Sequence, residues 1–176
     1  MKVKYVLITA IAVFISFFFH ELAHWVAGEL LGNKMGMSLN STYPISGKYL
    51  KSWHQTVVDA AGPLFTIIQA FVFYVIIDKT GKQELYPFLL MPFILRLLAM
   101  SLTFINPNDE ARISETAGVG ILTLPLLVCM LLFLPVYYIN NKYNYRLRFN
   151  GLTTAWMMAF LSILILSDQY FKIQVI

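Results

Sequence analysis

Long apolar runs alternate with short polar segments along the whole chain. The apolar runs cover residues 5–31, 57–77, 85–105, 117–139 and 152–167. Each is about as long as a bilayer-spanning helix, which needs roughly 20 mainly apolar residues. Most of the Lys, Arg, Asn and Gly residues lie between these runs. The pattern therefore predicts an all-α polytopic membrane protein with about five transmembrane helices.

The polar segment 33–55, between the first two apolar runs, has a different periodicity. Met37, Leu39 and Tyr43 all fall on odd positions, and this spacing is typical of a short β-strand. We expect a short β-hairpin at the membrane surface, whose edge could pair with an extended substrate. The alternative is a surface loop that Tyr and Trp hold at the lipid headgroups.

Composition narrows the class of protein. Hydrophobic residues make up 59% of the 176 residues and charged residues 12%, about half the usual share in a soluble domain. This argues against a soluble enzyme, a nucleic-acid binder and a disordered chain. The formal charge of +4 reflects Lys and Arg flanking the spans. A single cysteine, Cys129, excludes an intrachain disulfide framework. We expect one domain, residues 1–176, in the plasma membrane, with the lipid bilayer and a membrane protein as partners.

The first apolar run contains the motif H-E-x-x-H at residues 20–24. Positions i and i+4 share a face of a helix, so His20 and His24 can bind one metal ion, with Glu21 beside them. Shuffling this composition would produce the motif on the order of once in a thousand chains. A charged group inside an apolar span also costs roughly 2–3 kcal/mol, which a functional site would explain. The motif predicts one Zn²⁺ per chain, with Glu21 as general base.

A catalytic zinc ion usually has three protein ligands, so one further ligand is needed. His54 is the only other histidine, and it is more simply explained as an interfacial residue beside Trp53. Carboxylates are the remaining source, and residue chemistry alone leaves four of them open: Asp59, Asp109, Glu110 and Glu115. The preceding Asn106-Pro107 favours a turn, which could direct Asp109 back toward the helices.

Two further features interrupt the apolar runs. Gly62-Pro63 falls in the second run, where it could break the helix and line a cavity near the metal, or only kink it. Arg96 falls in the middle of the third run, where a charge is costly and normally faces the bundle interior. We expect Arg96 to pair with Asp59 or to polarise a substrate carbonyl.

With these motifs the chain resembles the site-2 protease family of intramembrane zinc metalloproteases. The first motif is H-E-x-x-H at 20–24, with Gly32 shortly after it. The second is Ala60-Ala61-Gly62-Pro63-Leu64, which is similar to the family's A-G-P-L motif. The third is Asn106-Pro107-Asn108-Asp109, which is similar to the family's N-P-x-D-G motif. The resemblance covers residues 5–120, and the additional spans 117–139 and 152–167 add nothing to it. Glu110 replaces the family's usual Gly, Thr66 its common Asn, and there is no PDZ-like insertion.

The resemblance implies an intramembrane protease that cuts membrane-anchored proteins in or near their transmembrane segments. Zinc would bind His20, His24 and Asp109. We also expect contacts with the substrate or the cavity from Gly62, Pro63, Thr66, Asn106 and Arg96. The family orientation implies an N-terminus outside, whereas the Lys and Arg distribution weakly favours the opposite, so orientation and oligomeric state stay open.

The alternative function is a non-enzymatic membrane protein. It would be either a degenerate protease that binds partners or a metal-handling protein. The intact H-E-x-x-H motif favours the enzyme, because Glu21 is needed for proton transfer but not for metal binding. Iron or cobalt would also suit two histidines and a carboxylate.

Overall fold

The computed structural model describes residues 2–171 and 173–176 as a mostly helical fold with one small antiparallel sheet. In chain order the elements are α1 (Val3–Leu30), β1 (Met35–Met37), β2 (Thr42–Pro44), α2 (Ser52–Thr80), the 3₁₀ turn η1 (Gln83–Leu85), α3 (Tyr86–Ser101), α4 (Asp109–Thr116), α5 (Thr123–Tyr143) and α6 (Leu147–Phe171). Within these residues, five helical segments are long and apolar enough to cross a membrane: α1, α2, η1 with α3, α5 and α6. The predicted fold class is confirmed.

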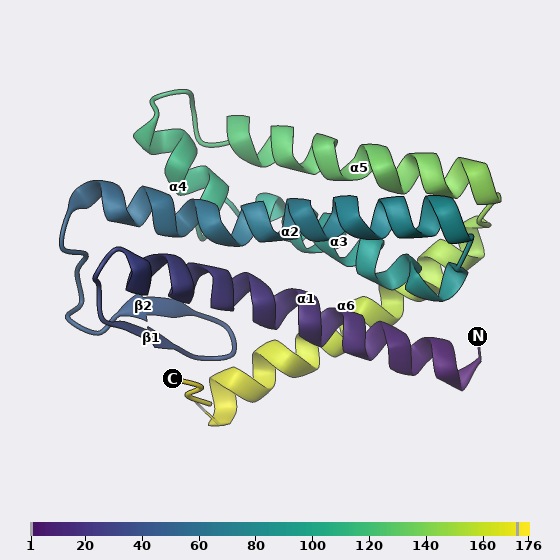
Figure 1. Cartoon of the computed structure of the whole chain (residues 1–176), viewed down its shortest axis with the longest axis horizontal. Coiled ribbons are helices and arrows are strands. Elements are labelled where there is room, and N and C mark those ends of the chain that lie inside the picture. Colours follow the sequence, from purple (N-terminus) through teal and green to yellow (C-terminus); the bar gives the residue numbers. More distant parts are fainter. Residues whose placement is uncertain (1, 172) are drawn as a thin grey trace.

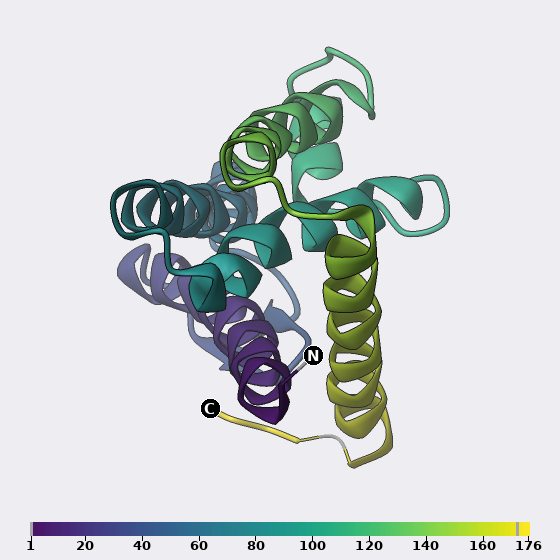
Figure 2. The same ribbon diagram turned by 90° about the vertical axis from the view of Figure 1, so that its right-hand side faces the viewer.

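The helices α1, α2 and α5 run side by side, and α3 passes behind α2 (Figure 1). The hairpin lies against the C-terminal end of α1, and α4 packs on α2 at that same end of the bundle. Seen from the side, α6 stands apart from the other helices, and it packs mainly on α1 (Figure 2). The hairpin and α4, which are too short to span a membrane, therefore lie at the same end of the bundle.

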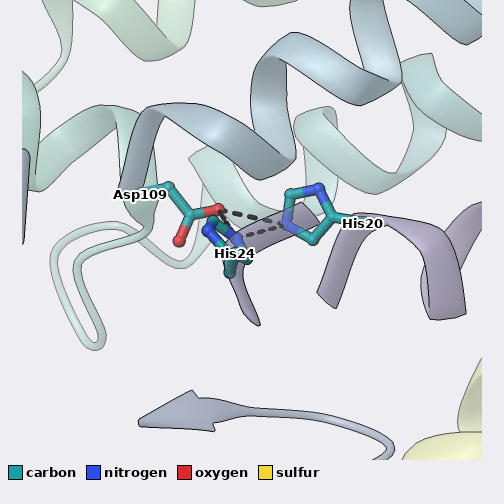
Figure 3. A group of neighbouring side chains, drawn as sticks. All are labelled: His20, His24 and Asp109. Carbon is teal, nitrogen blue, oxygen red and sulfur yellow. Dashed lines mark hydrogen bonds and ion pairs between the residues drawn. The ribbon is translucent and has the colours of Figure 1, made fainter. Parts of the chain in front are cut away.

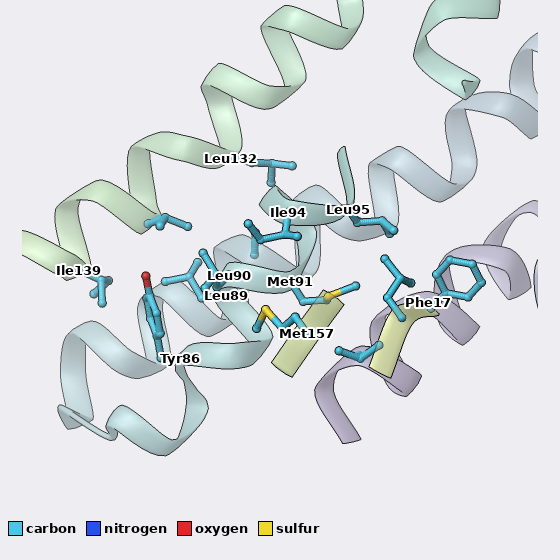
Figure 4. Packing of buried hydrophobic residues seen from close by; sticks show 14 of the residues in the cluster. Phe17, Tyr86, Leu89, Leu90, Met91, Ile94, Leu95, Leu132, Ile139 and Met157 are labelled. Carbon is cyan, nitrogen blue, oxygen red and sulfur yellow. The ribbon is translucent and has the colours of Figure 1, made fainter. Parts of the chain in front are cut away.

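Helix α3 forms the centre of the hydrophobic core. Its side chains pack against neighbours from α1, α5 and α6, including Phe17, Leu132 and Met157 (Figure 4). The outer faces of the helices expose large apolar side chains, as expected where lipid is the solvent. Examples are Leu7, Ile11, Ile68, Phe71, Met130, Leu134 and Ile163.

The third span and the segment after it differ from the sequence-based expectation. Helix α3 ends at Ser101, before the expected limit of 105, and a second helix, α4, begins at Asp109. The side chain of Asn108 caps α4, because its Oδ1 accepts a hydrogen bond from the Ala111 amide at 2.8 Å. Asp109 and Glu110 then occupy the first turn, where the helix dipole favours negative charge. The predicted turn is therefore also the start of a helix.

Pro63 does not break the second span. Helix α2 continues through it from Ser52 to Thr80 and begins five residues before the expected start at 57. Proline is tolerated inside membrane helices where neighbouring groups satisfy the freed backbone. Gly62 and Pro63 are both buried, so this part of α2 faces the protein rather than lipid.

The expected short hairpin is present and docks on the last turns of α1. Strand β1 pairs with β2 in the register Met35↔Pro44 and Met37↔Thr42. The Glu29 carboxylate accepts a hydrogen bond from the Met35 amide at 2.7 Å, and the Trp25 indole donates to the Met35 carbonyl at 3.2 Å. The hairpin is thereby fixed against α1.

The other edge of β1 is occupied by residues 173–176. The Met37 amide donates to the Ile176 carbonyl at 3.1 Å, and the Val175 amide donates to the Met37 carbonyl at 2.9 Å. At the end of α6, Asp168 accepts hydrogen bonds from the Ser38 hydroxyl and the Leu39 amide. The β1 edge is therefore paired within the chain.

Candidate metal centre

Three ligand atoms converge near the hairpin end of the bundle (Figure 3). The Nε2 atoms of His20 and His24 are 3.1 Å apart, and Asp109 Oδ2 lies 3.2 Å from the first and 3.5 Å from the second. Around a tetrahedral zinc ion with ligand distances of about 2.0–2.1 Å, neighbouring ligand atoms stand about 3.3 Å apart. The observed separations fit that requirement. This buried group can therefore hold a metal ion.

Two helices supply the ligands. Helix α1 presents His20 and His24 one turn apart, with 3% and 5% of their surfaces exposed. Asp109 is the first residue of α4, so the Asn108 cap fixes the point where its backbone enters the site. His24 is six residues before Leu30, or about 9 Å along the helix axis. The two histidines lie within a candidate membrane span, closer to the C-terminal end of α1.

Helix α2 shapes the group without contributing a ligand. His24 Nδ1 donates a hydrogen bond to the Val58 carbonyl at 2.5 Å, which leaves the Nε2 lone pair directed at the centre. Gly62 faces both rings: a Cβ on this residue would lie 2.3 Å from His20 Cε1 and from His24 Nε2. Only glycine allows α1 and α2 to approach this closely.

The Asp109 carboxylate is held by two arginines. Arg96 Nη1 donates to its Oδ2 at 3.0 Å, and Arg112 Nη2 donates to its Oδ1 at 2.8 Å. Two guanidinium groups at 3.0 and 2.8 Å favour the ionised form of this carboxylate. Asp109 is therefore an ionised ligand candidate.

The other three candidate carboxylates lie elsewhere. Glu110 is buried and pairs with Arg96 at 3.2 Å, and Asp59 pairs with Arg112 at 2.7 Å. Glu115 is exposed and lies outside the group. The expected Arg96–Asp59 pair is replaced by these two pairs, because α4 brings Arg112 to α2 and Glu110 to α3.

The formal charge of the cluster favours a divalent cation. Three carboxylates, Asp59, Asp109 and Glu110, pair with the two guanidiniums of Arg96 and Arg112, and a fourth, Glu21, lines the adjoining cavity. With all six groups ionised and the histidines neutral, the net charge is −2. A buried uncompensated charge is costly. One bound divalent ion would make the cluster neutral.

A polar cavity of about 260 Å³ opens beside the group. Glu21 lines it, and one of its carboxylate oxygens accepts a hydrogen bond from the Thr42 hydroxyl of β2 at 3.2 Å. The remaining lining residues are His24, Asn40, Ser41, Thr42, Tyr49, Val58, Asp59, Asn106, Asp109 and Arg112. The cavity provides a polar space next to the ligand group, large enough for water and a peptide group.

The sequence-predicted cavity residues divide into three sets. Asn106 lines the cavity, whereas Gly62 and Arg96 contact the histidines or Asp109 from outside it. Pro63 and Thr66 are buried within α2, where the Thr66 hydroxyl donates to the Pro63 carbonyl at 2.7 Å. Within the described chain, neither of them is part of the cavity lining.

Sequence reasoning missed the parts played by Val58, Thr42 and Arg112. Arg112 could have been found, because it stands three residues after Asp109 and such a pair shares a helix face. A backbone carbonyl such as that of Val58 leaves no signal in the sequence. His54 lies apart from the group and is hydrogen-bonded to Asn33 at 3.1 Å.

The arrangement offers two imidazoles, one carboxylate and a second carboxylate in the adjoining cavity. Such a donor set suits several divalent ions, including zinc, iron and cobalt. Comparisons of the chain with known protein families, with curated proteins and with solved structures found no match.

Proposed function

We propose that the chain is an intramembrane zinc metallopeptidase that hydrolyses membrane-anchored proteins in or near their transmembrane segments. The observation that carries this proposal is the convergence of His20, His24 and Asp109, with Glu21 in the adjoining polar cavity. Three motifs that resemble the site-2 protease family, in the family's order, support the same function. Those motifs supply His20, Glu21, His24 and Asp109.

Zinc is the proposed metal because catalytic zinc sites commonly combine three His or carboxylate ligands with an open position. The separations within the group fit tetrahedral coordination. When bound, zinc would act as a Lewis acid that polarises a peptide carbonyl and lowers the pKa of a water molecule. The cavity beside the group leaves room for that water and the scissile peptide.

The proton transfers are assigned to Glu21. As general base, its carboxylate takes a proton from the attacking water, and as general acid it then gives the proton to the leaving amine. The Thr42 hydroxyl shares its hydrogen between the Glu21 backbone carbonyl at 3.1 Å and one Glu21 carboxylate oxygen at 3.2 Å. The hairpin thus holds the base in position while α1 and α4 hold the ligands.

The proposed substrate must unwind before it is cut. In a helix the carbonyl oxygens accept i→i+4 hydrogen bonds and the side chains shield the backbone. A peptide bond reaches Glu21 only as an extended segment within the polar cavity. We therefore expect transmembrane segments with helix-destabilising residues to be the better substrates.

The test uses purified protein in detergent and in liposomes. A panel of single-span reporter proteins, with and without Gly or Pro in the span, is incubated with wild type and with Glu21→Gln. We expect wild type to cleave the destabilised spans and Glu21→Gln to be inactive while keeping its zinc. Equal cleavage by both proteins, or no cleavage of any reporter by zinc-loaded wild type, would contradict the proposal.

A further inference from the structure

Arg112 connects α4 to α2 through a guanidinium that makes four hydrogen bonds. Its Nε and Nη2 donate to the two carboxylate oxygens of Asp59 at 3.0 and 2.7 Å. Its Nη1 donates to the Pro107 carbonyl at 2.9 Å, and its Nη2 also donates to Asp109 Oδ1 at 2.8 Å. A planar fork held at both carboxylate oxygens has a fixed orientation. The atom that reaches Asp109 is therefore fixed in place.

The contact with Asp109 orients its carboxylate, with one oxygen held by Arg112 and the other facing the histidines. Arg112 binds Oδ1, and Oδ2 is the atom that lies 3.2 Å from His20 Nε2. Rotation of the carboxylate would break the Arg112 contact. Asp59 in turn is buried on α2, so the chain of contacts ends on a rigid helix.

We propose that Asp59 and Arg112 are positioning residues for the metal ligand Asp109, an inference that rests on the proposed metal centre. The same turn of α2 then sets two ligands. Val58 orients His24 through its carbonyl, and the next residue, Asp59, orients Asp109 through Arg112. Outer partners of this kind tune metal affinity although they do not touch the metal.

Arg96 has a different part in the cluster. It donates to Asp109 Oδ2, the oxygen that faces the histidines, its Nη2 lies 3.3 Å from His20 Nε2, and it also pairs with Glu110. Its contacts neutralise buried charge on both carboxylates. They do not hold the outer oxygen Oδ1, which within the described chain is bonded to Arg112. The positioning effect should therefore follow Arg112 and Asp59 together.

The test measures zinc affinity by chelator competition in the full-length protein in detergent. We expect Asp59→Asn and Arg112→Met each to weaken zinc binding by roughly 10- to 100-fold, the range for outer partners of metal ligands. Because Asp59 acts through Arg112, the double variant should bind no more than about twofold weaker than Arg112→Met alone. Asp78→Asn, which removes the Lys142 ion pair at the other end of the bundle, is the matched control. It should leave zinc affinity unchanged.

Cobalt substitution separates positioning from general stability. The absorption bands of bound Co²⁺ should shift in Asp59→Asn and Arg112→Met but not in Asp78→Asn, with equal helix content in all proteins. Arg112→Lys supplies a second variant if Arg112→Met does not fold. Lysine cannot hold both carboxylates, so its zinc affinity should fall between those of wild type and Arg112→Met.

Unchanged zinc affinity in Asp59→Asn and Arg112→Met would overturn the positioning proposal. So would fully additive losses in the double variant, or wild-type protein that binds no zinc. Peptide cleavage is a separate readout. If the two variants lose zinc affinity as expected but zinc-loaded wild type cuts no reporter, the proposed peptidase is contradicted and the positioning of Asp109 remains supported.

Discussion

Gly62→Ala tests the close approach of α1 and α2 at the ligand group. Alanine normally stabilises a helix interior by about 0.5–1 kcal/mol relative to glycine. At this position the added Cβ would lie 2.3 Å from His20 Cε1 and from His24 Nε2, whereas ordinary contact begins at 3.4 Å. The rings must therefore move by about 1 Å, several times the roughly 0.2 Å tolerance of metal–ligand distances. Overpacking of this kind costs about 1–3 kcal/mol.

We expect Gly62→Ala to bind zinc roughly 10- to 100-fold more weakly, the range for changes beside metal ligands. Its thermal stability in detergent should fall as well. Gly151→Ala is the matched control, because Gly151 lies in α6 with no atom within 4 Å of the added Cβ. It should keep its zinc, and its stability should be unchanged or higher by about 0.5–1 kcal/mol. If Gly62→Ala matched Gly151→Ala in both assays, the described approach of the two helices would be wrong.

Three further predictions concern single contacts in the cluster. Arg96→Met should destabilise the protein by about 3–5 kcal/mol in detergent unfolding, because it leaves the buried Glu110 unpaired. Adding Glu110→Gln should recover part of this stability, and no recovery would refute the pairing. Thr42→Val should lower the cleavage rate about tenfold with zinc content unchanged, since it removes the hydrogen bond to the proposed base. An unchanged rate would argue against a role of the hairpin in positioning Glu21. Asp109→Asn should lose zinc in a metal assay whereas Glu115→Gln keeps it, and the reverse result would move the third ligand to Glu115.

The membrane fold could be predicted from sequence because each span is long and apolar on most of its faces. The helix ends were harder to place. The start of helix α2 at Ser52 could not be read from the apolar run, because the first turn of this helix is polar and lies outside that run. Helix α4 was missed because Asn-Pro-Asn-Asp matches a loop composition, although Asn108 followed by Asp109 and Glu110 also matches a helix start.

The two histidines of the site could be predicted because both lie on one helix at a fixed spacing. The third ligand could not be derived from spacing, because it depends on how α4 packs against α2. The structure brings Asp109 to the histidines and places Glu110 on Arg96 and Asp59 on Arg112. The need for glycine at 62 likewise emerges only from the distance between α1 and α2. Such tertiary contacts leave no local pattern in the sequence.

The most direct test of the account is the metal content per chain of protein purified in detergent. His20→Ala removes a proposed ligand, and His54→Ala removes a buried histidine that lies outside the group. The account predicts about one zinc per chain in wild type and in His54→Ala, and a loss of zinc in His20→Ala. Two results would contradict a metal centre at His20, His24 and Asp109. One is folded wild type that stays free of metal after zinc is added back, and the other is equal zinc content in all three proteins.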